Sequence, residues 1–310
     1  SFRASVVFPD SYQSWTNLVI GGSVTTNIGN SAFSGCASLT SVSIPDSVTS
    51  IGTYAFSGCT GLTCVEIGGG VISIGSQAFY GCSGIREVFF RANMPSFRAS
   101  SVFPDSYQSW TNLVIGGTTT NVENSAFYGC TGLTSVKIGS GVTSIGTYAF
   151  SYCSGLIDIS VSEANMAYRS INGVLFNKDT SLLIQYPRGR EGAYSIPDGV
   201  TAIGSSAFSW CADLTVITIP NSVTNIANQA FSYCTNLVTV TIPDSVGNIG
   251  DGAFHGCTGL TGVKIGGGVI SIGSQAFSGC SGIRDVTLNL NLSSFLASSV
   301  FSSSYQSWTN

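Results

Sequence analysis

The residues with the clearest chemical potential in this sequence are its cysteines, and their spacing is regular. Nine of the 10 cysteines stand three residues after an Ala-Phe pair, most often 23 residues apart: Cys36, Cys59, Cys82, Cys130, Cys153, Cys211, Cys234, Cys257 and Cys280. Zinc sites need paired C-x-x-C spacing, which is missing here. Because equivalent positions of a repeat stack on one another, we expect a ladder of small buried thiols. Abundant free thiols favour a reducing compartment.

Cys64 is the cysteine outside this ladder. It stands at a strand position that Ser41 and Ser135 hold in other repeats, so we expect it to face solvent. One interpretation is a reactive or cross-linking thiol. The other is drift from serine, without a lowered thiol pKa.

An enzymatic function finds little support in the remaining residues. His255 is the only histidine, and it occupies a slot that Ser57, Tyr80 or Ser209 fill in other repeats, so a nucleophile would have one potential base at a tolerant surface position. Four aspartates follow proline, where turns ordinarily place them: Asp46, Asp105, Asp198 and Asp244. The sequence therefore predicts no enzyme.

The glycine-rich segments do not predict a cofactor either. GGGVISIG at 68–75 and 266–273 has the glycine spacing of a dinucleotide loop, but it lies between two short strands and opens no helix. We interpret these glycines as replacements of a Pro-Asp turn. We therefore expect no cofactor and no metal.

The elements that position these residues form a repeat. Each unit reads LxxVxIPDSVxxIGxxAFxxC, as in residues 39–59. The alternation of Leu39, Val42 and Ile44 with Ser and Thr predicts a short, half-buried strand, and Pro45 and Asp46 end it in a turn. The Ala-Phe pair is expected to fill the core, and we call the core-filling aromatic residue of each repeat its plug. This pattern predicts a solenoid with a parallel sheet.

Some units depart from the pattern. Degenerate copies containing SYQSW lie near 1–22, 96–117 and 294–310, with Phe8, Phe103 and Phe301 as plugs. An irregular insertion spans 160–195, where we expect Phe176 to be the plug. We predict one solenoid of about thirteen units over 1–310. Both ends interrupt a unit, so we interpret the chain as a fragment of a longer array, whose uncapped ends are expected to associate end to end.

The tyrosines and tryptophans of the SYQSW copies allow two interpretations. Tyr12, Tyr107 and Tyr305 with Trp15, Trp110 and Trp308 are suited to form aromatic protein-binding edges. The favoured interpretation puts each Trp in the Leu slot of the core, so that only Tyr and Gln touch solvent.

Composition narrows the classes of partner. The chain has 310 residues, a formal net charge of −4, a pI near 4.8 and only 8% charged residues, against roughly 25% in average soluble proteins. There is no basic stripe for nucleic acid or anionic lipid and no apolar run of membrane-spanning length. We therefore exclude nucleic acid and direct membrane insertion.

The outward face of the predicted sheet is the candidate binding surface. Its charged and aromatic members are Glu66, Arg86, Glu87, Phe89, Lys137, Asp158, Lys264, Arg284 and Asp285. Arg86 and Phe89 are the best anchor candidates, since arginine and aromatic residues dominate interface energetics. The alternative is a solvated sheet face whose ion pairs contribute little.

The motif as a whole resembles a known family. IPDSVTSIGTYAFSGCTGLTCV at 44–65, INGVLFNKDTSLLIQYPRG at 171–189 and YSIPDGVTAIGSSAF at 194–208 resemble the BspA-type leucine-rich repeats of bacterial surface proteins, also found in parasitic protists. The resemblance covers essentially the whole chain and implies a right-handed solenoid with a parallel sheet on its concave side. It also implies adhesion to host matrix, host-cell or microbial proteins, and a cell-surface or secreted location. It brings no catalytic residues. The alternative function is a structural spacer or an intracellular protein-interaction scaffold.

Overall fold

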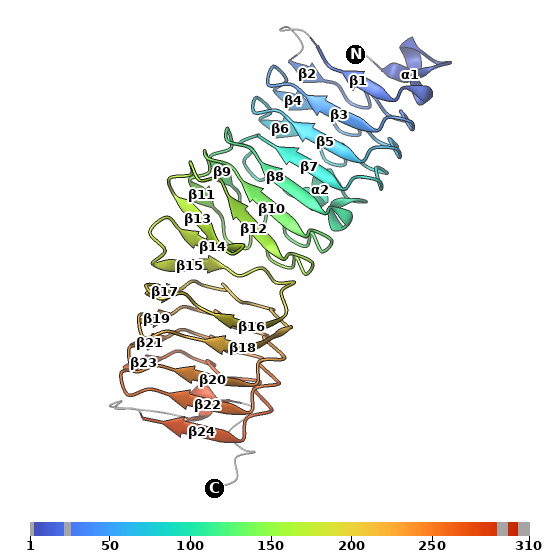
Figure 1. Ribbon diagram of the computed structural model, residues 1–310. Helices are drawn as coiled ribbons and strands as arrows, with labels where there is room; N and C mark the ends of the chain where they lie inside the picture. The colour runs from blue at the N-terminus through green and yellow to red at the C-terminus, as the bar shows by residue number, and fades with distance from the viewer. Residues whose placement is uncertain (1–2, 22–25, 290–296, 303–310) are drawn as a thin grey trace. The chain divides into compact units, whose positions relative to one another are not determined.

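The computed structural model describes residues 3–21, 26–289 and 297–302. The chain separates into two compact units, Ser1–Tyr168 and Arg169–Asn310. Each unit is a coil of short strands that repeats along the chain (Figure 1). The boundary falls inside the irregular stretch 160–195, and the prediction of one continuous solenoid domain stays a prediction.

The first unit carries its long strands in one seven-stranded sheet, ordered β1-β3-β5-β7-β8-β10-β12. These strands are β1 (Asn17–Val19), β3 (Ser41–Ile44), β5 (Cys64–Ile67), β7 (Glu87–Phe90), β8 (Asn112–Ile115), β10 (Ser135–Ile138) and β12 (Asp158–Val161). Two-residue strands line the opposite side of each coil: β2 (Asn27–Ile28), β4 (Ser50–Ile51), β6 (Ser73–Ile74), β9 (Asn121–Val122) and β11 (Ser144–Ile145). Neighbouring strands pair in parallel.

The second unit repeats this layout. Its long strands form a five-stranded sheet: β16 (Gly192–Ser195), β18 (Leu214–Thr218), β20 (Thr239–Ile242), β22 (Gly262–Ile265) and β24 (Asp285–Leu288). The other sheet runs β13 (Tyr168–Ile171), β14 (Val174–Asn177), β15 (Leu182–Gln185), β17 (Ala202–Ile203), β19 (Asn225–Ile226), β21 (Asn248–Ile249) and β23 (Ser271–Ile272). Strands β14 and β15 pair antiparallel, whereas β15 pairs in parallel with β17.

Helical turns mark the degenerate copies. They are α1 (Ala4–Val7), the 3-10 turn η1 (Tyr12–Ser14), α2 (Ala99–Val102), the 3-10 turn η2 (Tyr107–Ser109) and α3 (Ala297–Val300). Trp110 is fully buried and packs edge-on against Phe103, as the core interpretation predicted, whereas Trp15 is only half-buried. Tyr305 and Trp308 lie outside the described residues.

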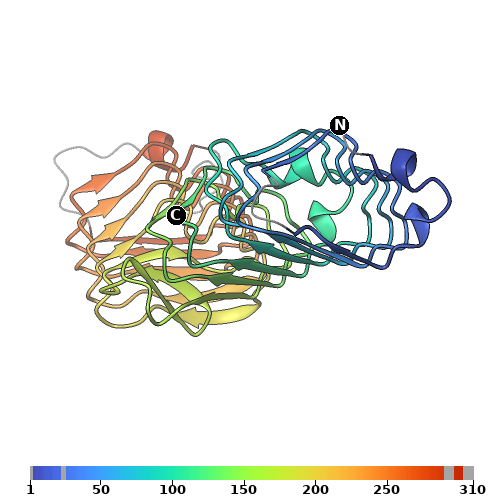
Figure 2. The same ribbon diagram turned by 90° about the horizontal axis from the view of Figure 1, so that it is seen from above.

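The core follows from the alternation along each strand. In β3 the outward Ser41 and Ser43 are exposed, while Val42 and Ile44 are buried and lie beside Val65 and Ile67 of β5. The phenylalanine plugs stack along the coil. In the second unit Phe208, Phe231, Phe254, Phe277 and Phe301 follow one another with centroid distances of 4.7, 4.9, 4.9 and 5.0 Å. In Figure 2 the successive turns of the first unit lie one behind another.

The plug of the irregular repeat at 160–195 is Tyr186. The prediction that Phe176 fills this position is wrong. The Tyr186 backbone N–H donates to the carbonyl of Ala207, as the Phe208 N–H donates to Ala230, and the Tyr186 ring stacks on Phe208 at 4.9 Å. Phe176 is buried instead in the antiparallel β14–β15 pair, opposite Leu183. An inserted hairpin, which the repeat pattern does not encode, displaced the plug along the sequence.

The cysteine ladder is buried, as predicted. The nine ladder thiols are free and buried. Several donate their S–H to the carbonyl of the phenylalanine 26 residues earlier, including Cys59 to Phe33 at 3.2 Å and Cys280 to Phe254 at 3.0 Å. Burial raises the pKa of the Cys211 thiol and of the Cys234 thiol. Cys211 and Cys234 are therefore spacers with little thiolate character.

The predicted fold class, a parallel β-solenoid of repeats, is confirmed. The two sheets of long strands contain seven and five strands, so about twelve turns of the solenoid contribute a long strand. The count of thirteen units stays a prediction, because the strand after Phe301 would lie outside the described residues. Among the described residues, none of the helices has the length and apolarity needed to cross a bilayer.

The stack of plugs generates a stability prediction. Phe254 is fully buried between Phe231 and Phe277, so replacing it with alanine should destabilise the chain by about 3–5 kcal/mol through lost burial and a cavity. The control is Ile270→Ala, because Ile270 is 77% exposed. Guanidinium unfolding followed by circular dichroism measures both. Equal unfolding midpoints for the two variants would contradict the proposed dependence on the stack.

Ser106 generates a second stability prediction. It occupies the cysteine slot three residues after Phe103 and is 1% exposed, and its Oγ has no hydrogen-bond partner among the described residues. A thiol costs less to bury than an unsatisfied hydroxyl, so Ser106→Cys should stabilise the chain by about 1 kcal/mol. Thermal unfolding under reducing conditions tests this, with Ser101→Cys as the exposed control. A lower melting temperature for Ser106→Cys would show that the slot does not accept a thiol.

Candidate functional site

The strands β5 and β7 bring most of the predicted residues of the first unit together. Their inward side chains are buried, while Cys64, Glu66, Glu87 and Phe89 point outward. In the parallel register Cys64 lies beside Glu87, and Glu66 lies beside Phe89. Four of the predicted residues therefore form one small patch on the outward face of the seven-stranded sheet. We call these four residues the β5–β7 patch.

An ion pair that sequence reasoning missed fixes the acidic side of this patch. Arg91 Nη2 lies 2.6 Å from Glu66 Oε1, and Ser43 Oγ donates to Glu66 Oε2 at 2.6 Å. The stem of Arg91 lies over Gly116, where a Cβ would stand 2.4 Å from Arg91 Cγ. The sequence contains a sign of this residue: Arg91 follows Glu87 and Phe89 at intervals of two, which places all three side chains on the same face of the strand. Because both charged side chains are about one-third exposed, the pair orients Glu66 more than it stabilises the fold.

Phe89 is the apolar centre of the β5–β7 patch. It is 37% exposed, and it lies between Glu66 on one side and Val114 of β8 on the other. A shallow hollow of about 260 Å³ opens beside it, lined by Ser41, Val42, Ser43, Cys64, Glu66 and Phe89. An exposed aromatic ring beside a hollow and an oriented carboxylate is an arrangement typical of protein interfaces.

Arg86 is less available than the sequence suggested. Its Nη1 donates to the carbonyls of Ser83 and Ile85, both at 2.9 Å, so the guanidinium is held against its own turn. Glu87 accepts from Asn112 Nδ2 at 3.3 Å. Phe89 is therefore the stronger of the two predicted anchors.

The other predicted residues divide between the two units. Lys137 of β10 continues the row of Glu66, Phe89 and Val114 on the first sheet, and Asp158 of β12 lies beside Ser135. Lys264 of β22 and Asp285 of β24 lie on the sheet of the second unit, and Arg284 precedes β24. Like Arg86, Arg284 donates to carbonyls of its own turn, Ser281 among them. The predicted set is thus two surfaces, one on each unit. Whether these residues bind a partner stays a prediction.

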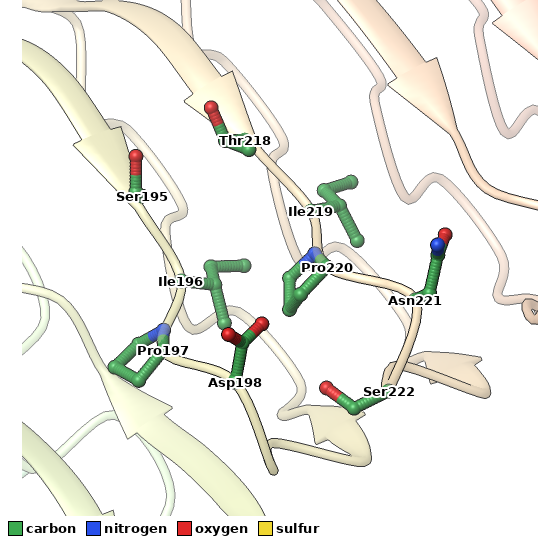
Figure 3. A pocket seen from close by; sticks show the side chains of 9 residues that line it. All are labelled: Ser195, Ile196, Pro197, Asp198, Thr218, Ile219, Pro220, Asn221 and Ser222. Atoms are coloured by element: carbon green, nitrogen blue, oxygen red, sulfur yellow. The ribbon is translucent and has the colours of Figure 1, made fainter.

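Another hollow, of about 580 Å³, lies between two turns of the second unit, where Figure 3 shows the Asp198 carboxylate between the prolines Pro197 and Pro220. The Gly199 N–H donates to Ser222 Oγ at 3.2 Å across it. In the parts of the chain that the structure describes, there is no group of three or more His, Cys, Asp or Glu placed to hold a metal ion.

Cys64 differs from the ladder thiols in its surroundings. It is half-buried, and its pKa is raised by burial and then by the nearby carboxylates of Glu87 and Glu66. A raised pKa leaves less thiolate at neutral pH, which argues against a strongly reactive thiol. Cys64 is on the outward face of β5, and its accessibility to reagents stays a prediction.

The surroundings of Cys64 predict its labelling behaviour. Iodoacetamide under native conditions should alkylate Cys64 faster than the nine buried ladder thiols, with a rate that still rises above pH 9, since its pKa is raised. Glu87→Gln should speed alkylation at pH 8, because removing the carboxylate lowers the thiol pKa. Peptide mass spectrometry against time measures both. Equal rates at Cys64 and Cys59 would contradict the buried ladder.

Comparison with known proteins agrees with this architecture. The model of the BspA type leucine rich repeat region matches residues 6–106, 99–185 and 193–307, in six copies. No curated protein matches the sequence.

Two solved structures are similar over most of the chain. A leucine rich cell surface protein from Faecalibacterium prausnitzii A2-165 is 29% identical, covering 92% of this chain and 89% of that chain, with a TM-score of 0.53. A leucine-rich repeat protein from Eubacterium ventriosum ATCC 27560 is 25% identical, and the alignment covers 85% of this chain and 70% of that chain, with a TM-score of 0.54. The family match extends over nearly the whole sequence, and the chain belongs to the BspA-type leucine-rich repeat family.

Proposed function

We propose that this chain is a non-catalytic protein-binding module of a cell-surface or secreted protein, and that the β5–β7 patch makes the central contact. The observation that carries the proposal is Phe89, a large aromatic side chain exposed on the outward face of a sheet whose other outward positions are mostly polar. A solvent-facing aromatic ring has no role in the core beneath it. Contact with a partner would give it one.

The surroundings of Phe89 support this function. Glu66 is already held by Arg91 and Ser43, so binding would order few further side chains there. The seven strands, spaced about 4.8 Å apart, extend for about 29 Å, which is enough length for a folded partner. The similarity to a leucine rich cell surface protein supports the location, and the partners we propose are host matrix, host-cell or microbial surface proteins.

The free thiols do not oppose a surface location. Nine of them are buried, and burial slows oxidation because it limits access of the oxidant to the sulfur. Cys64, the partly exposed thiol, has a raised pKa. The array can therefore keep its cysteines reduced outside a reducing compartment.

The proposal predicts the effect of removing Phe89. In surface plasmon resonance against a panel of extracellular matrix proteins, and in adhesion to intact host or microbial cells, Phe89→Ala should weaken binding about tenfold or more. Ile72→Ala is the matched control, because Ile72 is 64% exposed but lies in the turn before β6. Both variants should keep the wild-type melting temperature.

Two outcomes would overturn the proposal. Binding that Phe89→Ala leaves unchanged would remove the β5–β7 patch from the contact. A folded chain that binds none of these proteins and cells would favour the structural spacer, the alternative function of the array.

A further inference from the structure

A polar hollow in the second unit stands out from the regular repeat. It has a volume of about 420 Å³ and opens across three successive turns of the coil. Gln229 and Tyr233 come from the first turn, Asp251 and His255 from the second, and Ser274 and Gln275 from the third. None of the residues that line it is lysine or arginine.

The hollow exists because one repeat lacks a side chain. The residue before each Ala-Phe pair adopts a left-handed backbone, as at Tyr54 (φ 56°), Gln77 (φ 59°), Gln229 (φ 57°) and Gln275 (φ 56°). In the middle turn of the hollow this residue is Gly252, with φ 57°. A row of side chains along the coil is therefore interrupted between two glutamines, and the gap exposes the wall beneath.

That wall is rigid and polar. Tyr233 stacks on Trp210 at 4.0 Å between centroids, and its hydroxyl lies 3.2 Å from His255 Nε2. Tyr233 and Trp210 have φ values of 60° and 63° at a slot where other repeats carry glycine, such as Gly58. Tyr152 has the same backbone at this slot in the first unit (φ 61°), so the repeat accepts a bulky side chain there.

Two buried or fixed polar groups complete the site. Asp251 Oδ1 accepts the Ser274 N–H at 2.7 Å, which holds the carboxylate at the rim. His255 Nδ1 is buried and has no hydrogen-bond partner among the described residues. The hollow thus combines a carboxylate acceptor, two amides that both donate and accept, and an imidazole oriented by a tyrosine.

We propose that this hollow binds a neutral sugar residue of a glycan. Each hydroxyl of a sugar both donates and accepts, and this matches the mixture of Asp251, Gln229 and Gln275 around one gap. An anion would meet the Asp251 carboxylate without a cation to balance it. An apolar side chain would leave the amides unpaired, at a cost in free energy. The volume accommodates a monosaccharide with part of a neighbouring sugar.

The single histidine gives a direct readout of this site. The ring Cε1–H signal of His255 is the only such histidine signal in the chain, so NMR can follow it during titration with D-glucose, D-galactose, D-mannose, L-fucose and N-acetylglucosamine. At least one of these sugars should shift the signal in a saturable way.

Substitution of Gly252 tests the location. Gly252→Tyr should fill the gap and weaken binding about tenfold or more, and the fold should tolerate it, because Tyr54 adopts the same backbone in its repeat. Gly252→Ser is the matched control, since Ser31 and Ser125 hold this slot elsewhere (both φ 54°) and a serine leaves most of the hollow open. It should retain binding within about threefold. Melting temperatures establish that both variants are folded.

The outcomes separate clearly. A saturable His255 shift that Gly252→Ser keeps and Gly252→Tyr loses supports the site. The absence of any shift with the five sugars, or a shift that persists in Gly252→Tyr, overturns it. A loss of the shift in Gln77→Ala, whose glutamine occupies the equivalent slot in the first unit, would also overturn it, because the effect would then not be local to the hollow.

Discussion

The structure depends on one constraint, the transfer of backbone hydrogen bonds from each repeat to the next in constant register. The N–H of most plug phenylalanines donates to the carbonyl of the residue before the next plug, as Phe231 does to Ala253 and Phe254 to Ala276, both at 2.7 Å. The ring stack and the thiol ladder follow from this register, because identical positions are brought face to face. A residue in a plug slot is therefore buried by its neighbours in the coil rather than by its own repeat.

The same constraint explains what the sequence could and could not predict. The strands, turns and plugs of the regular repeats follow from periodicity, since every copy of LxxVxIPD meets an identical environment. The plug of the irregular unit does not, because the register is carried by the backbone and not by residue type. Tyr186 holds the register through Ala207, while Phe176, the more plug-like residue, was taken into a hairpin. A tyrosine before a proline gave no signal of a plug.

The candidate surfaces show a similar division. Alternation along β5 and β7 was enough to place Cys64, Glu66, Glu87 and Phe89 outward, because strand geometry alone decides this. The partner of Glu66 is Arg91, just beyond the end of β7, and the pair depends on room that Gly116 leaves in the following repeat. Such an interaction spans three repeats and is not visible in any one of them. The hollow at Gly252 was missed for the same reason, since it is defined by a side chain that one repeat lacks.

A repeat fold can keep its core constant while its surface slots change separately. The first residue after the plug phenylalanine is Ser57, Tyr80 or His255 in different repeats. The second residue after it is Gly58, Trp210 or Tyr233. Neither change alters the backbone register. Each departure from the common residue therefore alters only the local surface, provided that the left-handed backbone there can be maintained. Binding sites of different chemistry can thus arise on one array, an apolar and acidic one on the strands and a polar one at the turns, because neither uses residues that the core requires.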